Sequence, residues 1–253
     1  MQASSKPKTK KNMKRTIILT AIIALATSFA SAQQTSGTIV YEITTDVEKM
    51  MQWFMPDRKM DTYSWKEEWK FRKSKAELKF TASETIYEPI VEETMDRWGG
   101  ATEEHTIYSN KEKNKVCYVI RQMGKLSIVD DSIPKMKWKV TNAMKEVAGH
   151  ICMSATYNDT IMGQEITAWF ALDMPIPYGP DVYHGLPGMI LQIDLYGGGQ
   201  IYAAKTITMS DTPVKIDKPK YKKKTKTMTV AEYQAQVYKF MQDMKKRPGG
   251  MMF

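Results

Sequence analysis

Apolar and polar residues alternate with a period of two over most of the chain after residue 36. Such alternation is typical of strands with one buried face. The segments that show it are 37–44, 76–81, 116–123, 125–129, 136–140, 146–157, 165–171, 189–196 and 200–209. Because no regular helical pattern separates these segments, their spacing favours an antiparallel sheet over an alternating α/β fold.

Two of the connections between these segments predict hairpins. Residues 158–163 separate the strand 146–157 from the strand 165–171, and three glycines at 197–199 separate the last two strands. Short glycine-containing loops of this kind join antiparallel neighbours. We therefore expect both pairs of strands to be adjacent in the sheet.

The pattern changes to a helical period near the C-terminus. Thr229 and Glu232 have the spacing of a capping box, and a helix is expected over about 229–246. Its apolar face consists of Val230, Tyr233, Val237, Met241 and Met244. The basic stretch 215–226 before it is interpreted as a solvated linker, with binding to an anionic surface as the alternative.

Together these patterns predict a mainly β fold. We expect a β-rich α+β architecture, in which one curled antiparallel sheet or open barrel packs against the C-terminal amphipathic helix. Residues 47–75 fit this pattern least. Their aromatic residues are Trp53, Phe54, Tyr63, Trp65, Trp69 and Phe71, interleaved with many charges. The segment predicts either a helix or excursion that buries its aromatics on the sheet, or an aromatic-lined surface for a ligand or partner.

Residues 1–32 have the pattern of a signal peptide. Six basic residues precede an apolar run at 16–26, and the tripeptide ASA at 30–32 is an A-x-A cleavage site. The residue directly after this site is not a cysteine, so lipid attachment at the new N-terminus is not expected. We expect an exported protein, periplasmic or associated with the cell envelope, that is cleaved after Ala32. Met13 is an alternative start that would still leave a complete signal.

The signal peptide changes the meaning of the formal net charge of +9. The six basic residues of 1–32 have no acidic residue beside them, so residues 33–253 are left with +3. That charge is too small to indicate a nucleic-acid partner. Residues 33–253 are long enough for a single domain with a sizeable core, and they contain no apolar run of transmembrane length.

Cys117 and Cys152 are the two cysteines of the chain, and each lies in a strand-like run. In an exported protein an even pair more often forms a disulfide than a metal site. We therefore expect these two residues to be bridged. Two buried, unpaired thiols are the alternative.

The stretch 178–194 organises the second half of the chain. Pro187 sets its own φ at about −65°, and Gly188 would supply the positive φ that the third position of a type II turn needs. The strand 189–196 follows at once. We therefore expect the turn to be an architectural element that aims this strand.

The residues of this turn also carry a resemblance. They are Gly185, Leu186, Pro187, Gly188, Met189 and Ile190, which read GLPGMI. The sequence resembles the GLPGLI family, a group of exported proteins from Gram-negative bacteria whose function is unassigned. The similarity is specific over about 138–195 and includes Trp138, Cys152 and Trp169. It implies an association with outer-membrane uptake systems, and it carries over no catalytic residue.

No catalytic motif is present in the sequence. A G-x-S-x-G elbow, an H-E-x-x-H pair, a Walker loop and a dinucleotide fingerprint are all missing, so neither a catalytic residue nor a cofactor is predicted. His105, His150 and His184 are too scattered to define a metal site. His184 lies with Tyr183 beside the motif, and these two residues are the ones that a ligand-binding lip would use.

These features favour a non-enzymatic binding or accessory protein of the cell envelope. Its partner would be a small ligand or an outer-membrane protein. One alternative is a periplasmic copper-handling protein that uses some of the 20 methionines together with His184. Several methionines lie at core-like spacings, however, where this side chain fills gaps. A hydrolase with a site dispersed along the sequence is the third alternative.

Overall fold

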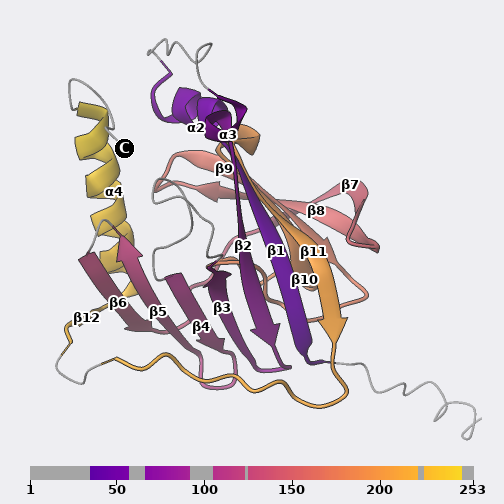
Figure 1. Ribbon diagram of the computed structural model, residues 1–253. Helices are drawn as coiled ribbons and strands as arrows, with labels where there is room; N and C mark the ends of the chain where they lie inside the picture. Colours follow the sequence, from indigo (N-terminus) through magenta and orange to yellow (C-terminus); the bar gives the residue numbers. More distant parts are fainter. Residues whose placement is uncertain (1–34, 57–65, 92–104, 123–124, 222–224, 247–253) are drawn as a thin grey trace, which may run out of the picture. The chain divides into compact units, whose positions relative to one another are not determined.

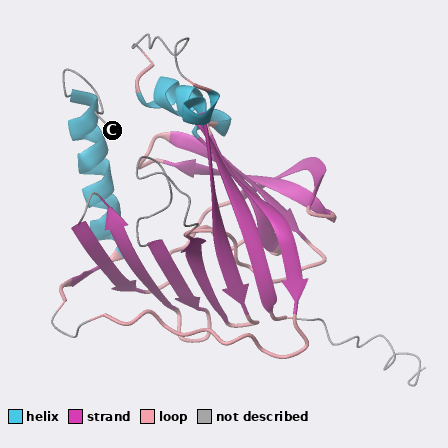
Figure 2. Cartoon of the chain, viewed as in Figure 1, coloured by secondary structure: helices cyan, strands magenta, loops and turns pink. Residues whose placement is uncertain are grey.

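The computed structural model describes residues 35–56, 66–91, 105–122, 125–221 and 225–246. The strands of these residues form one sheet of twelve, which curls around a core (Figure 1, Figure 2). Across the sheet the order is β12 (Thr227–Met228), β6 (Lys125–Asp131), β5 (Lys115–Gln122), β4 (His105–Asn110), β3 (Glu84–Ile90), β2 (Phe71–Phe80), β1 (Gly37–Asp46), β11 (Gln200–Met209), β10 (Met189–Leu195), β9 (Gln164–Ala171), β8 (His150–Asp159) and β7 (Lys139–Val147). The mainly β fold class is confirmed, and the sheet is open, with edges at β12 and β7.

Neighbouring strands pair antiparallel throughout this sheet, apart from the short parallel pair of β12 with β6. The predicted hairpins at 158–163 and 197–199 are present as the β8–β9 and β10–β11 connections. The first half of the sheet shares its core with the segment after β9 and with the start of the C-terminal helix. Within the sheet, the hydroxyl of Tyr41 in β1 donates to the carbonyl of Ile190 in β10 at 2.7 Å.

The described helices are α2 (Val47–Phe54), α3 (Glu67–Lys70) and α4 (Val230–Lys246), with a 3-10 turn η1 (Tyr196–Gly198). None of them is both long and apolar enough to cross a bilayer. The helical interpretation of the aromatic segment holds for α2, where the rings of Trp53 and Phe54 each lie 5.0 Å from the ring of Tyr196. Residues 57–65 of that segment, and the expected signal peptide at 1–32, lie outside the described residues.

The segment between β9 and β10, residues 172–188, is called the motif segment below. The hydroxyl of Tyr178 donates to the carbonyl of Ser83, between β2 and β3, at 3.0 Å. The indole N–H of Trp138 donates to the carbonyl of His184 at 2.8 Å. Parts of the chain that are distant in sequence are therefore held together by the motif segment.

The glycines of the motif do not form the predicted type II turn. Gly185 has φ of +91°, whereas Gly188 does not lie in the positive-φ region. A Cβ on Gly188 would lie 2.0 Å from the carbonyl oxygen of Ala171, because the start of β10 pairs there with the end of β9. The type II turn is thus wrong: Gly188 is needed for close approach of two backbones and Gly185 for its conformation.

A second correction concerns the predicted strand 146–157. It is two strands, β7 and β8, joined by a tight turn at Ala148 and Gly149 with φ of +50° and +84°. Two consecutive residues of positive φ form the turn whose twist suits a two-residue hairpin. The alternation continues through this turn, and for that reason the sequence pattern did not reveal it.

The expected disulfide is also wrong. Cys117 in β5 and Cys152 in β8 are both buried and both free, and their strands lie near opposite edges of the sheet. Each has its own surroundings: Cys117 is opposite Asp130 in the register, and Cys152 is opposite Ala171. Burial raises the pKa of each thiol to about 11, so both side chains are protonated at neutral pH.

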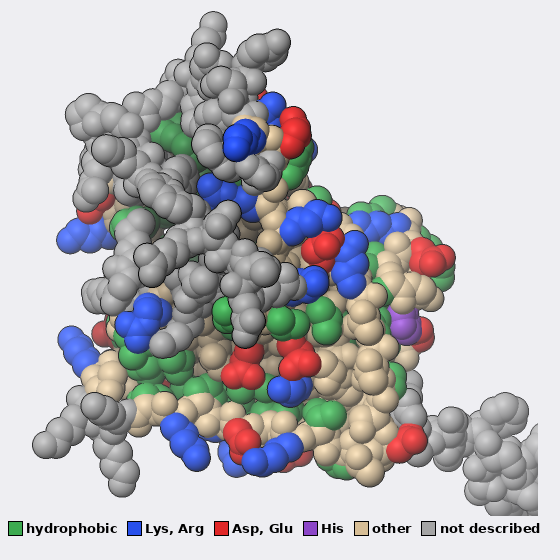
Figure 3. All heavy atoms as spheres, viewed as in Figure 1, with side chains coloured by type: hydrophobic (Ala, Val, Ile, Leu, Met, Phe, Trp, Pro, Cys, Tyr) green, Lys and Arg blue, Asp and Glu red, His purple; other side chains and the backbone are tan. Residues whose placement is uncertain are grey.

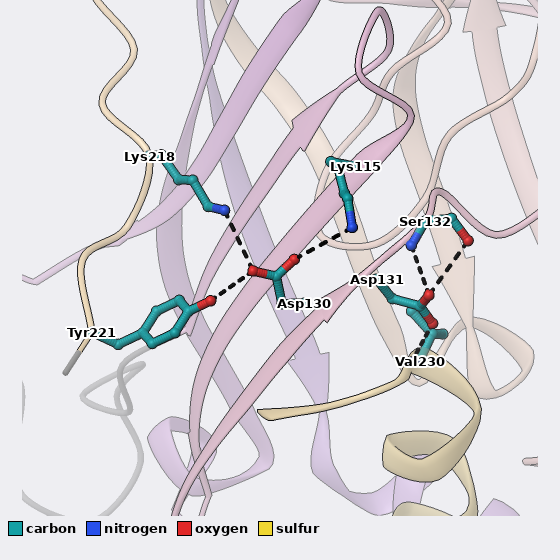
Figure 4. Close-up of polar contacts among 7 residues, drawn as sticks. All are labelled: Lys115, Asp130, Asp131, Ser132, Lys218, Tyr221 and Val230. Atoms are coloured by element: carbon teal, nitrogen blue, oxygen red, sulfur yellow. Dashed lines mark hydrogen bonds and ion pairs between the residues drawn. The ribbon is translucent and has the colours of Figure 1, made fainter. Parts of the chain in front are cut away.

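The C-terminal helix α4 is attached mainly by its first turn. The capping box is present, with the backbone N–H of Thr229 donating to Glu232 at 2.7 Å and that of Glu232 donating to Thr229 at 3.1 Å. Val230 is buried and its backbone N–H donates to the carboxylate of Asp131 at 2.9 Å (Figure 4). Tyr238, farther along the helix, is 47% exposed.

The basic linker before α4 is tied to the same strand. In Figure 1 it passes along the ends of the strands between β11 and β12. Asp130 of β6 accepts from the hydroxyl of Tyr221 at 2.6 Å and from the ammonium of Lys218 at 3.4 Å (Figure 4). Adjacent carboxylates of β6 therefore hold the linker and the helix.

We expect Asp131→Asn to loosen α4. The variant loses one of two acceptor oxygens and the negative charge at the helix N-terminus, an effect of about 1 kcal/mol. Amide hydrogen exchange in α4 should become faster, whereas Asp130→Asn, which weakens contacts with the linker and with Lys115 of β5 but none with α4, should leave α4 protected. Equal protection of α4 in wild type and in Asp131→Asn would contradict this attachment.

Lowering the pH should loosen α4 in the same way as Asp131→Asn. The backbone N–H groups of Val230 and Ser132 hold the pKa of Asp131 below its usual value. A lowered pKa in the folded state gives a stabilisation that is complete above the ordinary carboxyl pKa of about 3.9 and is lost as the pH falls through the lowered value.

Candidate binding site

A histidine–aspartate pair links β4 to the motif segment. The Nε2 of His105 lies 2.7 Å from Oδ1 of Asp181, and the two side chains are 33% and 16% exposed. A carboxylate can only accept, so Nε2 carries the proton in this contact. Asp181 has φ of +55°, a left-handed conformation that aspartate adopts more readily than most residues.

Five tyrosines have phenol groups on which the charge of Asp181 acts. They are Tyr87 of β3, Tyr118 of β5, Tyr183 of the motif segment, Tyr196 of η1 and Tyr202 of β11, and together they are called the inner tyrosine cluster below. Strand register explains two of the positions: Ile107 of β4 is opposite both Tyr87 and Tyr118, so both rings and His105 project from one face.

The hydroxyl groups of the inner tyrosine cluster have no hydrogen-bond partner among the described residues, unlike the bonded hydroxyls of Tyr41 and Tyr178. Tyr118 and Tyr87 are only 2% and 4% exposed. Yet no side-chain oxygen or nitrogen in the described ranges is both fully buried and without a partner. The small exposed area of these two residues therefore includes the hydroxyl oxygen.

Tyr183 and Tyr202 lead to the same conclusion. Burial raises the pKa of both phenols well above the usual value, so protein surrounds them closely. Both nevertheless keep accessible surface. These two side chains are thus largely enclosed by protein and keep some contact with solvent.

The electrostatic environment of the cluster is negative. Burial is the main cause of the raised pKa of all five phenols, and the charge of Asp181 adds to the rise in each. Burial, together with the charges of Asp159 and Asp181, raises the pKa of Tyr196 to about 12. No lysine or arginine in the described part of the chain lies close enough to lower the pKa of any of them.

The two residues of the predicted ligand lip have different roles. Tyr183 belongs to the inner tyrosine cluster. His184 is held by backbone on both sides of its ring, with Nδ1 2.8 Å from the carbonyl of Val182 and Nε2 2.7 Å from the carbonyl of Pro134. Of the motif, Leu186, Met189 and Ile190 are buried in the core and point to architecture.

Most of the site was not predicted from the sequence. Tyr183 was expected at a ligand site but Asp181 was not, and His105 was one of three histidines that looked too scattered to matter. The signal that could have pointed to the site was a tyrosine at a core-facing position of a predicted strand, as at Tyr118. A buried phenol normally has a hydrogen-bond partner, and the sequence offers none nearby.

The described side chains offer no group of three or more histidines, cysteines, aspartates or glutamates that could hold a metal ion. On the face drawn in Figure 3, lysines and arginines are interspersed with aspartates and glutamates. The charged residues that act on the inner tyrosine cluster are, by contrast, all acidic.

Comparisons with known proteins give a partial family match and a fold. A family model described as "Protein of unknown function (Porph_ging)" matches residues 160–192, which include the GLPGMI motif. No curated protein matches the sequence. Two solved structures of PNGF-II, in the P21 and C2 space groups, superpose with TM-scores of 0.53 and 0.51 at 12% and 13% identity, each covering 81% of this chain. The chain spans 33% of the PNGF-II chain, and at this identity the likeness concerns the fold alone.

Proposed function

We propose that this protein binds a small ligand, without transforming it, beside the inner tyrosine cluster. The observation that carries the proposal is a set of phenol groups that the fold encloses and whose hydroxyls have no hydrogen-bond partner among the described residues, those of Tyr87 and Tyr118 still reaching solvent. Folded proteins pair buried polar groups, and those left for a ligand mark a binding site.

The arrangement around Asp181 supports binding more than catalysis. The pair with His105 orients the carboxylate, and the two cysteines are buried thiols in other parts of the sheet. The left-handed backbone of Asp181 is a conformation that surrounding structure must maintain, as is common at ligand sites.

We further propose that the chain acts in the cell envelope as a GLPGLI-type exported protein, and that the bound ligand or a partner belongs to an outer-membrane uptake system. The A-x-A site at 30–32 and the motif at 185–190 support this part of the proposal.

The binding site predicts a separation between stability and ligand retention. Replacing Tyr118 or Tyr87 by phenylalanine removes a hydroxyl that no group of the described residues bonds, so the free energy of unfolding should change by less than about 0.5 kcal/mol. Tyr41→Phe is the matched control, because its hydroxyl is bonded to Ile190 and its loss should destabilise the fold by about 1–3 kcal/mol.

Native mass spectrometry of the chain purified from the producing cells checks the ligand. Wild type and Tyr41→Phe should carry a small-molecule adduct, and the Tyr87→Phe/Tyr118→Phe double variant should carry at least about tenfold less, as expected when hydrogen bonds to a ligand are removed. A wild type without any adduct, or the same adduct in the double variant, would contradict the proposal.

A further inference from the structure

We infer that the motif segment is a pH-sensitive element, which is held to the rest of the fold while its histidine contacts are protonated and becomes looser as the histidines lose their protons. This inference concerns how residues 172–188 are attached. It does not depend on the proposed ligand.

All three histidines of the chain make their contacts with the motif segment. His105 of β4 contacts Asp181 at 2.7 Å, and His150 of β8 contacts Asp173 at 2.7 Å. His184 lies in the segment itself. Imidazole is the side chain whose charge changes between about pH 5 and 8, so the attachment of this one segment depends on the groups that titrate there.

The contacts of His184 require a ring that carries both protons. Its Nδ1 lies 2.8 Å from the carbonyl oxygen of Val182, and its Nε2 lies 2.7 Å from the carbonyl oxygen of Pro134. Carbonyl oxygens only accept, and a neutral imidazole has a single N–H. Neither neutral tautomer can therefore make both bonds, whereas the imidazolium makes both.

The bond to Pro134 joins the motif segment to a connection that spans the sheet. Residues 132–138 lead from β6, next to one edge, to β7 at the opposite edge. Trp138 of the same connection donates from its indole to the carbonyl of His184 at 2.8 Å. Loss of the bond from His184 to Pro134 would leave Trp138 as the remaining hydrogen bond of His184 to this connection.

The two histidine–aspartate pairs are also stronger when the ring is protonated. A neutral imidazole can donate to a carboxylate, but the protonated ring adds the attraction between opposite charges. Asp181 is 16% exposed, so water screens its pair with His105 only in part. Asp173 is 61% exposed, and a solvated pair of this kind contributes little.

The other titratable groups on the elements around these rings are not imidazoles, so they do not titrate in the same range. They are Tyr87, which faces the ring of His105, Lys145 and Glu146 beside His150, and Lys135, Lys137, Asp159, Tyr178 and Tyr183 around His184. A contact that prefers the protonated ring is complete on the acid side and is lost as the pH rises through the histidine range. The motif segment should therefore become looser with rising pH.

Amide hydrogen exchange of the purified chain tests this inference. The N–H of Gly185 donates to the carbonyl of Pro177 at 2.9 Å inside the motif segment and serves as the reporter. Its protection, corrected for the intrinsic exchange rate at each pH, should fall at least about tenfold between about pH 5.5 and 8.5, as expected when a charge-assisted bond is lost. The amides that pair β10 with β11 should keep their protection.

His184→Gln is the decisive variant, with His150→Gln as the matched control. Glutamine can donate one hydrogen bond and does not titrate, so His184→Gln should reduce the change in protection to about threefold or less. His150→Gln makes the same substitution at the solvated pair and should stay within about twofold of the wild-type change.

Three results would contradict the inference: equal protection of Gly185 at the two pH values, an equal fall in the β10–β11 amides, or the full wild-type change in His184→Gln. If that variant does not fold, nitrogen NMR of the wild-type imidazole decides. Both ring nitrogens of His184 should carry protons at about pH 5.5 and only one at about pH 8.5. A neutral His184 ring at the lower pH would show that the inference is wrong.

Discussion

Gly188→Ala is expected to be the most destabilising single methyl addition in the motif. The new Cβ would lie 2.0 Å from the carbonyl oxygen and 2.8 Å from the carbonyl carbon of Ala171, and both are backbone atoms that cannot rotate away. The start of β10 must therefore move from the end of β9. Overpacking of this kind costs about 3 kcal/mol, and the melting temperature should fall by roughly 6–12 °C for a chain of this size.

Gly185→Ala is the matched control within the same motif. Its φ of +91° disfavours alanine, but the added Cβ has no atom within 4 Å. The expected loss is the conformational term alone, about 1 kcal/mol. Thermal unfolding of the two variants side by side decides the point: if Gly185→Ala is the less stable protein, then local conformation dominates and the close approach of β9 and β10 is unimportant.

Leu186→Ala is expected to have the second large effect. Leu186 is 2% exposed and belongs to a core cluster with Phe170, Ile190 and Ile193. Truncation removes buried methyl groups and leaves a cavity between β9, β10 and the motif segment, so about 2–5 kcal/mol of stability should be lost. Denaturant unfolding would give the midpoint shift and, from the slope, a check that the transition remains two-state.

Leu172→Ala supplies the comparison for this substitution. It is the same chemical change in the same motif segment, but Leu172 is 52% exposed. Its effect should stay within about 0.5 kcal/mol, as for most surface substitutions. Similar losses in the two leucine variants would show that Leu186 does not pack as described.

The sequence could predict the fold where the pattern is local. The alternation at 189–196 and 200–209, together with the glycines between them, determined β10, β11 and their hairpin. The capping box of Thr229 with Glu232 determined where α4 begins. In each case the residues that set the structure are close together in the chain, so their spacing is sufficient.

The predictions from the sequence were wrong where a distant part of the chain determines the local structure. Gly188 fits a type II turn by its neighbours alone, but the carbonyl of Ala171 is what requires a glycine there. In β3 the residues Thr85, Ile86 and Tyr87 are all buried, because the strand is covered on both faces, so the alternation that marks a strand is missing. Cys117 and Cys152 were paired from the compartment alone, and only the order of the strands shows them apart.

The candidate site was the least predictable part for the same reason. A strand with Tyr118 on its apolar face was expected, but nothing near Tyr118 in the sequence indicates that its hydroxyl lacks a partner. The charge of Asp181 acts on Tyr118 although the two residues are distant in the sequence. A cluster of residues from five elements becomes recognisable only when all of them are in place.

The position of β1 between β2 and β11 has a consequence for how the chain reaches its native state. β1 to β6 follow one another as a meander of successive neighbours, and so do β7 to β11. The two meanders are joined where Gly37 pairs with Met209. Gly37 and Met209 are separated by most of the described chain, and contacts of such long sequence separation slow the folding of β proteins. A ribosome must release nearly all of the chain before β1 can meet its second neighbour, and until then that edge of the strand is open to pairing with other molecules.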